Sequence, residues 1–239
     1  MSMRAVWDIV RKAPLKDLVN PNKLRLFYKV WPFTMVGYRR LANAHHLAGL
    51  IEEKGLEGAI VECGVWKGGC SAVMAHQTTL AGSKRNVWLF DSFQGLPVPT
   101  MSDGDKACDL VEGNATGALA PIGKCEGTYE DVRRVFFDVL DLPEERVKVV
   151  QGWFQDTLPE HKSTIDPIAL LRLDGDWYES TKVCLDNLYD KVVSGGYIII
   201  DDYGHWEGCR RAVDEFFEKH GINVDLVTID ETGCYFKKP

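Results

Sequence analysis

Residues 58–69 read GAIVECGVWKGG, a short apolar run that passes directly into a glycine-rich turn. The run at 59–61 has the length of a buried strand, and helical sequence follows the glycines from about Ser71. A strand, a glycine turn and a helix in this order are typical of a ligand-binding α/β sheet, because the free N–H groups at the start of the helix face the ligand. The spacing GxxxGG differs from the GxGxxG dinucleotide fingerprint, which disfavours NAD.

The pattern of this first unit continues along the chain. Further short apolar segments predict strands at 87–90, 147–150, 168–173 and 197–200, with helices at 36–54, 71–80, 128–140, 179–193 and 208–220, and a hairpin at 224–236. Such alternation predicts parallel βαβ units, and therefore an α/β fold. We expect residues 1–57 to form a helical N-terminal extension, or cap, on a main domain at 58–239. The long connection at 94–127 is interpreted as a lid or acceptor loop, with a disordered insert as the alternative.

The composition excludes several classes of protein. The chain has 239 residues, with 28 Lys plus Arg against 35 Asp plus Glu and a formal net charge of −7. An acidic chain without a basic cluster disfavours a nucleic-acid partner. No apolar run is long enough for a membrane span. The seven cysteines are scattered and form no CxxC pair, which predicts reduced thiols in a cytoplasmic protein.

Acidic residues stand at the ends of most of the expected strands. Because the carboxyl ends of parallel strands meet at one edge of the sheet, we expect these side chains to gather around a ligand. They are Glu62, Asp91, Asp174, Asp176, Asp201 and Asp202. Asp91 is placed to accept the ribose hydroxyls of a nucleoside. Glu62 can face the ammonium or sulfonium group of S-adenosylmethionine, whereas it would repel the pyrophosphate of NAD.

The four aspartates after the last two parallel strands predict a metal site. Four like charges at one sheet edge repel one another, and such clusters persist when a cation lies among them. Carboxylate oxygens select hard ions such as Mg²⁺ or Mn²⁺. Helix capping is the alternative, and it would explain one or two of the aspartates. A metal beside a nucleoside cofactor can orient an acceptor hydroxyl and lower its pKa, while a free carboxylate takes the proton.

Five ordered motifs carry a family resemblance. They are ECGVWKGG from Glu62, DSFQGLP from Asp91, GWFQDTLP from Gly152, LDGDWYEST from Leu173 and DDY from Asp201. Together with Thr34-Met35, they resemble the macrocin/mycinamicin O-methyltransferase family over about residues 34–220. The resemblance implies a class I methyltransferase, Rossmann-like fold, with a seven-stranded, mostly parallel sheet and an antiparallel C-terminal hairpin.

The resemblance also implies two cofactors, S-adenosylmethionine and Mg²⁺ or Mn²⁺, and a set of site residues. Asp176 is the implied general base, and the implied metal ligands are Asp174, Asp201 and Asp202. The implied cofactor-binding residues are Thr34, Met35, Glu62, Gly64, Gly68, Ser71, Asp91, Ser92, Gly152, Trp153 and Asp156. Of these, Asp91 would hold the ribose, Asp156 would lie near the adenine, and the pair at 34–35 would close over the cofactor.

These observations predict a metal-dependent O-methyltransferase that acts on a hydroxyl of a small molecule. The favoured acceptor is a sugar moiety of a natural product, with a second oxygen next to the reacting hydroxyl. The alternatives are a catechol-type O-methyltransferase, an NAD-dependent oxidoreductase and a non-catalytic Rossmann-like binding module. Apolar residues of the N-terminal extension that need cover predict a homodimer. They are Trp7, Phe27, Tyr28, Trp31 and Phe33.

Overall fold

The computed structural model describes residues 13–14, 17 and 19–239, and within them seven strands form one sheet. The strands are β1 (Ala59–Cys63), β2 (Val87–Asp91), β3 (Val147–Gln151), β4 (Ile168–Leu173), β5 (Val192–Ile200), β6 (Val227–Thr228) and β7 (Cys234–Lys237). Their order is β3-β2-β1-β4-β5-β7-β6. Strands β1 to β5 are parallel, whereas β7 runs antiparallel to both β5 and β6. The predicted sheet with its antiparallel C-terminal hairpin is confirmed.

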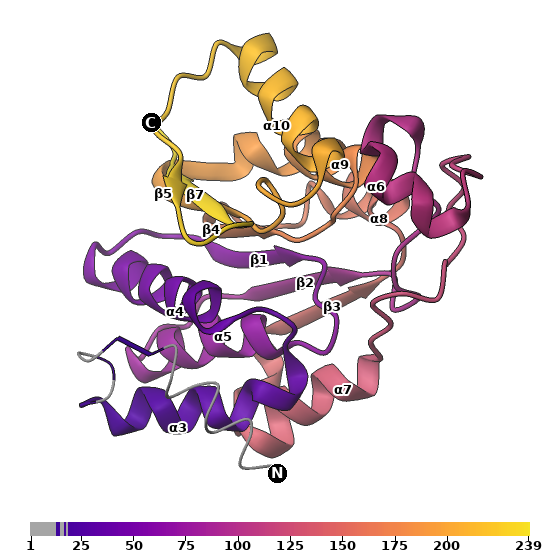
Figure 1. Cartoon of the computed structure of the whole chain (residues 1–239). Coiled ribbons are helices and arrows are strands. Elements are labelled where there is room, and N and C mark those ends of the chain that lie inside the picture. The colour runs from indigo at the N-terminus through magenta and orange to yellow at the C-terminus, as the bar shows by residue number, and fades with distance from the viewer. Residues whose placement is uncertain (1–12, 15–16, 18) are drawn as a thin grey trace.

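Helices cover both faces of this sheet (Figure 1). One layer contains α3 (Pro21–Val30), α4 (Tyr38–Glu53), α5 (Gly69–Leu80) and α7 (Tyr129–Arg133), and the other contains α8 (Phe154–His161), α9 (Tyr178–Leu188) and α10 (Glu207–His220). Each layer buries its own apolar cluster against the sheet, and successive strand residues alternate between them. Ile60 belongs to the first cluster and Val61 to the second, as the two-residue period of a strand requires.

The predicted N-terminal extension forms part of the first layer. Helix α3 begins at Pro21, where a missing N–H costs nothing, and the side chain of Asn20 accepts a hydrogen bond from the N–H of Lys23. Phe27 and Phe33 are buried by this chain itself, so they give no reason to expect a partner. Trp7 lies outside the described residues. The homodimer remains a prediction.

Two elements differ from the sequence prediction. Strand β5 begins at Val192, inside the segment expected as helix, and the β4–β5 register shifts near its start, where Gly195 has φ +83°. Gly195 and Gly196 allow the backbone irregularity at the start of this strand. In the sequence, the same two glycines are typical of the end of a helix. Helix α8 was not expected, because Pro159 interrupts its short apolar pattern. None of the helices in the described ranges combines the length and apolar character needed to cross a bilayer.

The connection at 94–127 folds into short helical turns. They are η2 (Met101–Asp103), α6 (Asp105–Cys108) and η3 (Asp109–Val111); elsewhere the chain has η1 (Trp31–Phe33), the π-helix η4 (Arg134–Val139), η5 (Glu144–Arg146) and η6 (Tyr189–Lys191). Asp103 is 1% exposed, and its Oδ1 accepts the N–H of Tyr178, the first residue of α9, at 2.5 Å. The connection is therefore docked on α9 through a buried carboxylate. Its role as a lid remains a prediction.

Candidate active site

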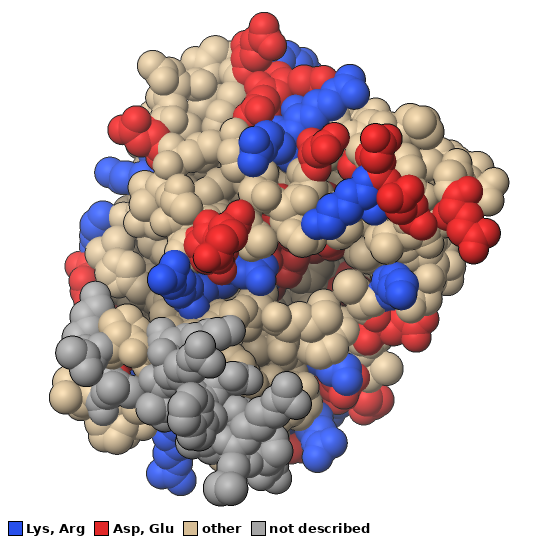
Figure 2. All heavy atoms as spheres, viewed as in Figure 1, with Lys and Arg blue, Asp and Glu red and all other residues tan. Residues whose placement is uncertain are grey.

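A cavity opens at the carboxyl ends of the parallel strands. Figure 2 shows a recess on this face, with acidic atoms in its depth. Ten of the predicted site residues line the cavity: Met35, Gly64, Asp91, Ser92, Gly152, Trp153, Asp174, Asp176, Asp201 and Asp202. The other five, which are Thr34, Glu62, Gly68, Ser71 and Asp156, do not line it.

The glycine turn after β1 brings two strand ends together. Gly64 has φ +89°, and a Cβ atom at this position would lie 1.7 Å from the carbonyl oxygen of Asp174. Only glycine fits here, because both the backbone conformation and the contact exclude a side chain. Gly68 has φ +83°, and a Cβ atom there would meet the side chains of Val132 and Val135 instead. Gly68 thus serves packing against α7, while Gly64 shapes the cavity.

Asp91, at the end of β2, is held toward the cavity by the same turn. Its Oδ2 accepts the N–H groups of Val65 at 2.7 Å and Trp66 at 2.8 Å, and its Oδ1 accepts that of Phe93 at 2.7 Å. Burial raises the pKa of Asp91, and these hydrogen bonds oppose the rise. A carboxylate has about four acceptor sites, so about one remains for a ligand hydroxyl.

Arg172 in β4 is the charged centre that sequence reasoning missed. It is 1% exposed, and its guanidinium donates to Glu62, to Asp174 Oδ2 at 2.8 Å and to Asp201 Oδ1 at 2.5 Å. A buried guanidinium is stable only with such partners. The available signal was the arginine itself, which interrupts the otherwise apolar strand IALLRL at 168–173.

Glu62 and Ser71 belong to this buried network. Glu62 is 1% exposed and accepts hydrogen bonds from the Ser71 hydroxyl and from Arg172. Burial raises the pKa of Glu62 to about 7, although the positive charge of Arg172 opposes the rise. Glu62 is therefore held between Arg172 and the Ser71 hydroxyl, and the contact of Glu62 and Ser71 with the cofactor remains a prediction.

Asp201, one of the predicted metal ligands, is engaged by two arginines. Arg172 donates to its Oδ1, and Arg40 from α4 donates to its Oδ2. The Nε of Arg40 lies 3.3 Å from Asp230 Oδ2, so Arg40 forms a second ion pair in addition to that with Asp201. Arg40 also lines the cavity, and among the lining residues it is the one cationic side chain. Its role was not visible in the sequence, because it lies about 160 positions before Asp201.

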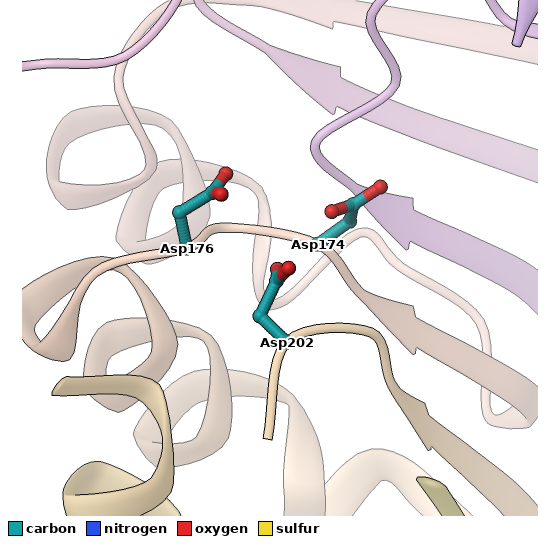
Figure 3. A group of neighbouring side chains, drawn as sticks. All are labelled: Asp174, Asp176 and Asp202. Atoms are coloured by element: carbon teal, nitrogen blue, oxygen red, sulfur yellow. The ribbon is translucent and has the colours of Figure 1, made fainter. Parts of the chain in front are cut away.

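Three further carboxylates lie beside this network, and only one of them, Asp174, is paired with an arginine. Oxygen atoms of Asp174, Asp176 and Asp202 all lie within 4.8 Å of one another, on the ends of β4 and β5 (Figure 3). Asp202 is 7% exposed, and its Oδ2 is buried without a hydrogen-bond partner. Burial and then the negative charges of Asp176 and Asp174 raise the pKa of Asp202 well above its usual value. Burial and then Asp174 raise that of Asp176 to about 7.

This front cluster, Asp174, Asp176 and Asp202, fits a hard divalent cation. A buried carboxylate oxygen without a donor is costly, and a cation is the partner that such an all-oxygen group takes. Two of its members were predicted as ligands and the third as the base. The predicted ligands were Asp174, Asp201 and Asp202. The cluster contains Asp176 in place of Asp201, because both oxygens of Asp201 accept hydrogen bonds from arginines.

The turn after β3 closes the other end of the cavity. Gly152 has φ +144°, and a Cβ atom there would lie 2.7 Å from Thr157 Cγ2. Trp153 and the first residues of α8 line the cavity, whereas Asp156 does not. Lining residues that were not singled out in the sequence are Val36, Arg40, Trp66, Gly95, Leu96, Pro97, Cys125, Phe154, Gln155, Gly175 and Ser180.

Comparison with known proteins identifies the family. Residues 19–238 match the family model described as macrocin O-methyltransferase (TylF). The chain belongs to the macrocin O-methyltransferase family. The predicted family and enzyme class are therefore confirmed, and membership excludes the oxidoreductase and the non-catalytic binding module.

Named relatives in this family are O-methyltransferases of natural products. A demethyldecarbamoylnovobiocin O-methyltransferase of Streptomyces niveus is 40% identical over 235 residues, which cover 93% of this chain and 83% of the relative. A second relative, from Streptomyces olivaceus, is named 8-demethyl-8-(2,3-dimethoxy-alpha-L-rhamnosyl)-tetracenomycin-C 4'-O-methyltransferase. It is 36% identical to this chain, and the match covers 96% of this chain and 87% of the relative.

Solved structures agree with the fold. The O-methyltransferase NovP superposes with a TM-score of 0.73 at 39% identity, over 86% of this chain and 82% of its own. The methyltransferase MycE, solved with Mg, SAH and mycinamycin VI, superposes with a TM-score of 0.53 at 15% identity, over 91% of this chain and 54% of its own. Family and fold together make this chain an O-methyltransferase of the S-adenosylmethionine type.

Proposed function

We propose that this macrocin O-methyltransferase uses S-adenosylmethionine and a divalent cation, Mg²⁺ or Mn²⁺, to methylate a sugar hydroxyl of a small natural product. The observation that carries the proposal is the front cluster with the unpartnered Asp202 Oδ2 inside the cavity. The name of the tetracenomycin relative, which methylates a rhamnosyl group, supports a sugar acceptor.

The cofactor would lie across the ends of β1, β2 and β3. Asp91 is the acceptor for one ribose hydroxyl, because its other acceptor sites are taken by backbone amides. The adenine would rest between Trp153, Gln155 and Ser92, which line that end of the cavity. Met35 is 56% exposed and lines the same cavity, so it is free to cover the bound cofactor. Thr34 would support this cover from behind, next to Gly69.

In the proposal, Asp174 and Asp202 hold the cation, with Asp176 beside them. When bound, the cation supplies Lewis acidity that lowers the pKa of an acceptor hydroxyl and orients two neighbouring acceptor oxygens. Asp201 holds Arg172 and Arg40 in place behind the cluster. If Asp201 were also a direct ligand, as predicted, one of its oxygens would have to bind the cation and an arginine at the same time.

Asp176 is the proposed general base. It stands in a left-handed conformation with φ +57°, directly after Gly175, and this turn aims its carboxylate at the other two. A base must lie within hydrogen-bond reach of the proton that it removes, and this role is supported by the position of Asp176 in the cavity lining, beside the proposed ligands Asp174 and Asp202. Alignment of that oxygen with the methyl group supplies much of the acceleration.

The catechol-type alternative loses its main support. Trp177 and Tyr178 follow the DGD motif and could have formed an aromatic wall for a planar acceptor. Trp177 is 2% exposed and does not line the cavity, and the hydroxyl of Tyr178 donates to Glu215 at 2.6 Å. Neither of these two rings lines the cavity, so the support that they gave to a catechol acceptor is lost.

The test is an acceptor screen with methyl-labelled S-adenosylmethionine and protein treated with EDTA. We expect label transfer to glycosylated acceptors after Mg²⁺ or Mn²⁺ is restored, and none to the matching aglycones or to catechol. Undiminished transfer in EDTA would refute metal dependence, and preference for catechol would refute the sugar assignment. A cytoplasmic location and a homodimer remain predictions.

A further inference from the structure

We propose that Trp206 is a positioning residue, which fixes the carboxylate of Asp176 through its indole N–H. Through Trp206, the orientation of this carboxylate also depends on residues 94–127. The proposal rests on the proposed role of Asp176 as the base. No sequence motif singled out Trp206, and it does not line the cavity.

The contact between the two side chains is direct. The indole Nε1–H of Trp206 donates to Asp176 Oδ1 at 2.7 Å. Trp206 is 9% exposed, so this hydrogen bond is largely shielded from water. An indole has one N–H and accepts nothing, so it can bind only one carboxylate oxygen. Holding Oδ1 leaves the second oxygen of Asp176 to face Asp174 and Asp202 and to receive a proton.

Trp206 itself is fixed by the segment that follows Asp202. The backbone N–H groups of His205 and Trp206 both donate to the carbonyl of Asp202, at 2.9 and 3.0 Å. The ring packs edge-on against Trp177, with centroids 4.9 Å apart. A single tight turn therefore carries both a cluster carboxylate and the donor that orients the base, so their spacing is set by local backbone geometry.

The 94–127 connection covers the outer face of this tryptophan. Lys106 Nζ lies 4.5 Å from the ring centroid and donates to His205 Nε2 at 2.9 Å. A cation over an indole is attracted to the ring and makes its N–H a stronger donor. The same connection holds the neighbouring ring, because Trp177 Nε1 donates to the carbonyl of Pro97 at 2.9 Å. An acceptor that contacts this connection is thereby coupled to the orientation of Asp176.

The two indoles offer a matched pair of substitutions. Trp206→Phe removes the donor to Asp176 and keeps an aromatic ring, and Trp177→Phe removes the donor to Pro97. We expect Trp206→Phe to lower kcat by about 10- to 100-fold, the equivalent of one hydrogen bond to a charged group. The KM for S-adenosylmethionine, Mn²⁺ affinity and Tm should stay near their wild-type values. Trp177→Phe should act on Tm and acceptor KM, with kcat close to wild type.

Lys106→Met provides a second variant that leaves the core intact. We expect it to lower kcat by about 2- to 5-fold, as loss of an exposed cation–π contact would. Asp176→Asn is measured in parallel, and wild-type turnover by that variant would refute the base assignment itself. If Asp176→Asn is inactive while Trp206→Phe keeps wild-type kcat, the positioning role alone is refuted. Should Trp206→Phe fail to fold, an unchanged kcat in Lys106→Met overturns the coupling.

Discussion

The rear network, Glu62 and Asp201 around Arg172, and the front cluster, Asp174, Asp176 and Asp202, lie at the same edge of one sheet. Both are rich in carboxylates, but the arginines are divided unequally between them. Arg172 and Arg40 donate to the rear carboxylates, whereas the front cluster receives one such bond, from Arg172 to Asp174 Oδ2. The front cluster has an unpartnered buried oxygen on Asp202. The difference teaches that, in these two groups, a carboxylate has a structural or a ligand-binding role according to whether donors of the chain occupy both of its oxygens.

The largest expected effect comes from removing the cation of the rear network. Arg172→Met should cost about 3 to 5 kcal/mol of unfolding free energy, because it leaves buried carboxylates without a counter-charge. Urea unfolding measures it. The control is Arg133→Met, whose pair with Glu144 is exposed and screened by solvent, so its loss should leave the unfolding free energy almost unchanged. Equal small losses in the two variants would contradict the structural role of Arg172.

The pH dependence of stability in the metal-free protein should report the buried carboxyl groups whose pKa is raised, which include Glu62 as well as Asp176 of the front cluster. Burial and then Asp174 raise the pKa of Asp176 to about 7, so the folded state keeps a proton that the unfolded chain releases near pH 4. This contribution to stability is fully present below about pH 4 and is lost as the pH rises through 7, by about 2 to 4 kcal/mol. Unfolding in EDTA at pH 5 and pH 8 measures it, with Asp176→Asn as the variant in which the difference shrinks. If Asp176→Asn loses as much unfolding free energy between pH 5 and pH 8 as the wild type does, a group other than Asp176 is responsible for the loss.

Neutralising one aspartate in each region should change stability in opposite directions. Asp201→Asn removes the partner of two arginines and should lower the unfolding free energy of the metal-free protein by about 1 to 2 kcal/mol. Asp202→Asn removes a repelled charge and should raise it by about 1 kcal/mol. Thermal unfolding in EDTA compares them. Stabilisation by both variants would show that Asp201 belongs to the repelling group.

The smallest expected effect is at the edge of the rear network. Ser71→Ala removes the hydroxyl that donates to Glu62 and should cost about 1 kcal/mol, with no change in metal affinity. Unfolding and Mn²⁺ titration of the same preparation separate the two quantities. A clear loss of Mn²⁺ affinity would mean that the rear network also holds the front cluster in place.

The sequence predicted the sheet, its hairpin and the acidic strand ends well, because each follows from short local patterns. Asp91, Asp174 and Asp201 stand directly after apolar runs, Asp202 follows one residue later, and parallel strands bring their ends together. The direction in which each carboxylate points could not be predicted from the sequence. Glu62 and Arg172 are paired across β1 and β4, strands separated by more than 100 positions, so only the register of the folded sheet shows that they meet.

The distant partners of the site were equally hidden. Arg40 reaches Asp201 from a helix near the start of the chain, and Lys106 reaches Trp206 from a connection without apolar periodicity. Asp156 is the opposite case, and its place near the adenine remains a prediction. Its motif was recognised, but it lies in the first turn of a helix that the sequence pattern did not predict, and it does not line the cavity.

The central claim is that the front cluster holds a divalent cation, and Mn²⁺ titration followed by electron paramagnetic resonance tests it most directly. We expect one Mn²⁺ per chain in the wild type, displaced by Mg²⁺. Binding should weaken by about 100-fold or more in Asp202→Asn, since even residues that only orient a ligand cost about 10- to 100-fold. Ser71→Ala should bind as the wild type does. No specific Mn²⁺ binding, or equal affinity in Asp202→Asn, would contradict the account.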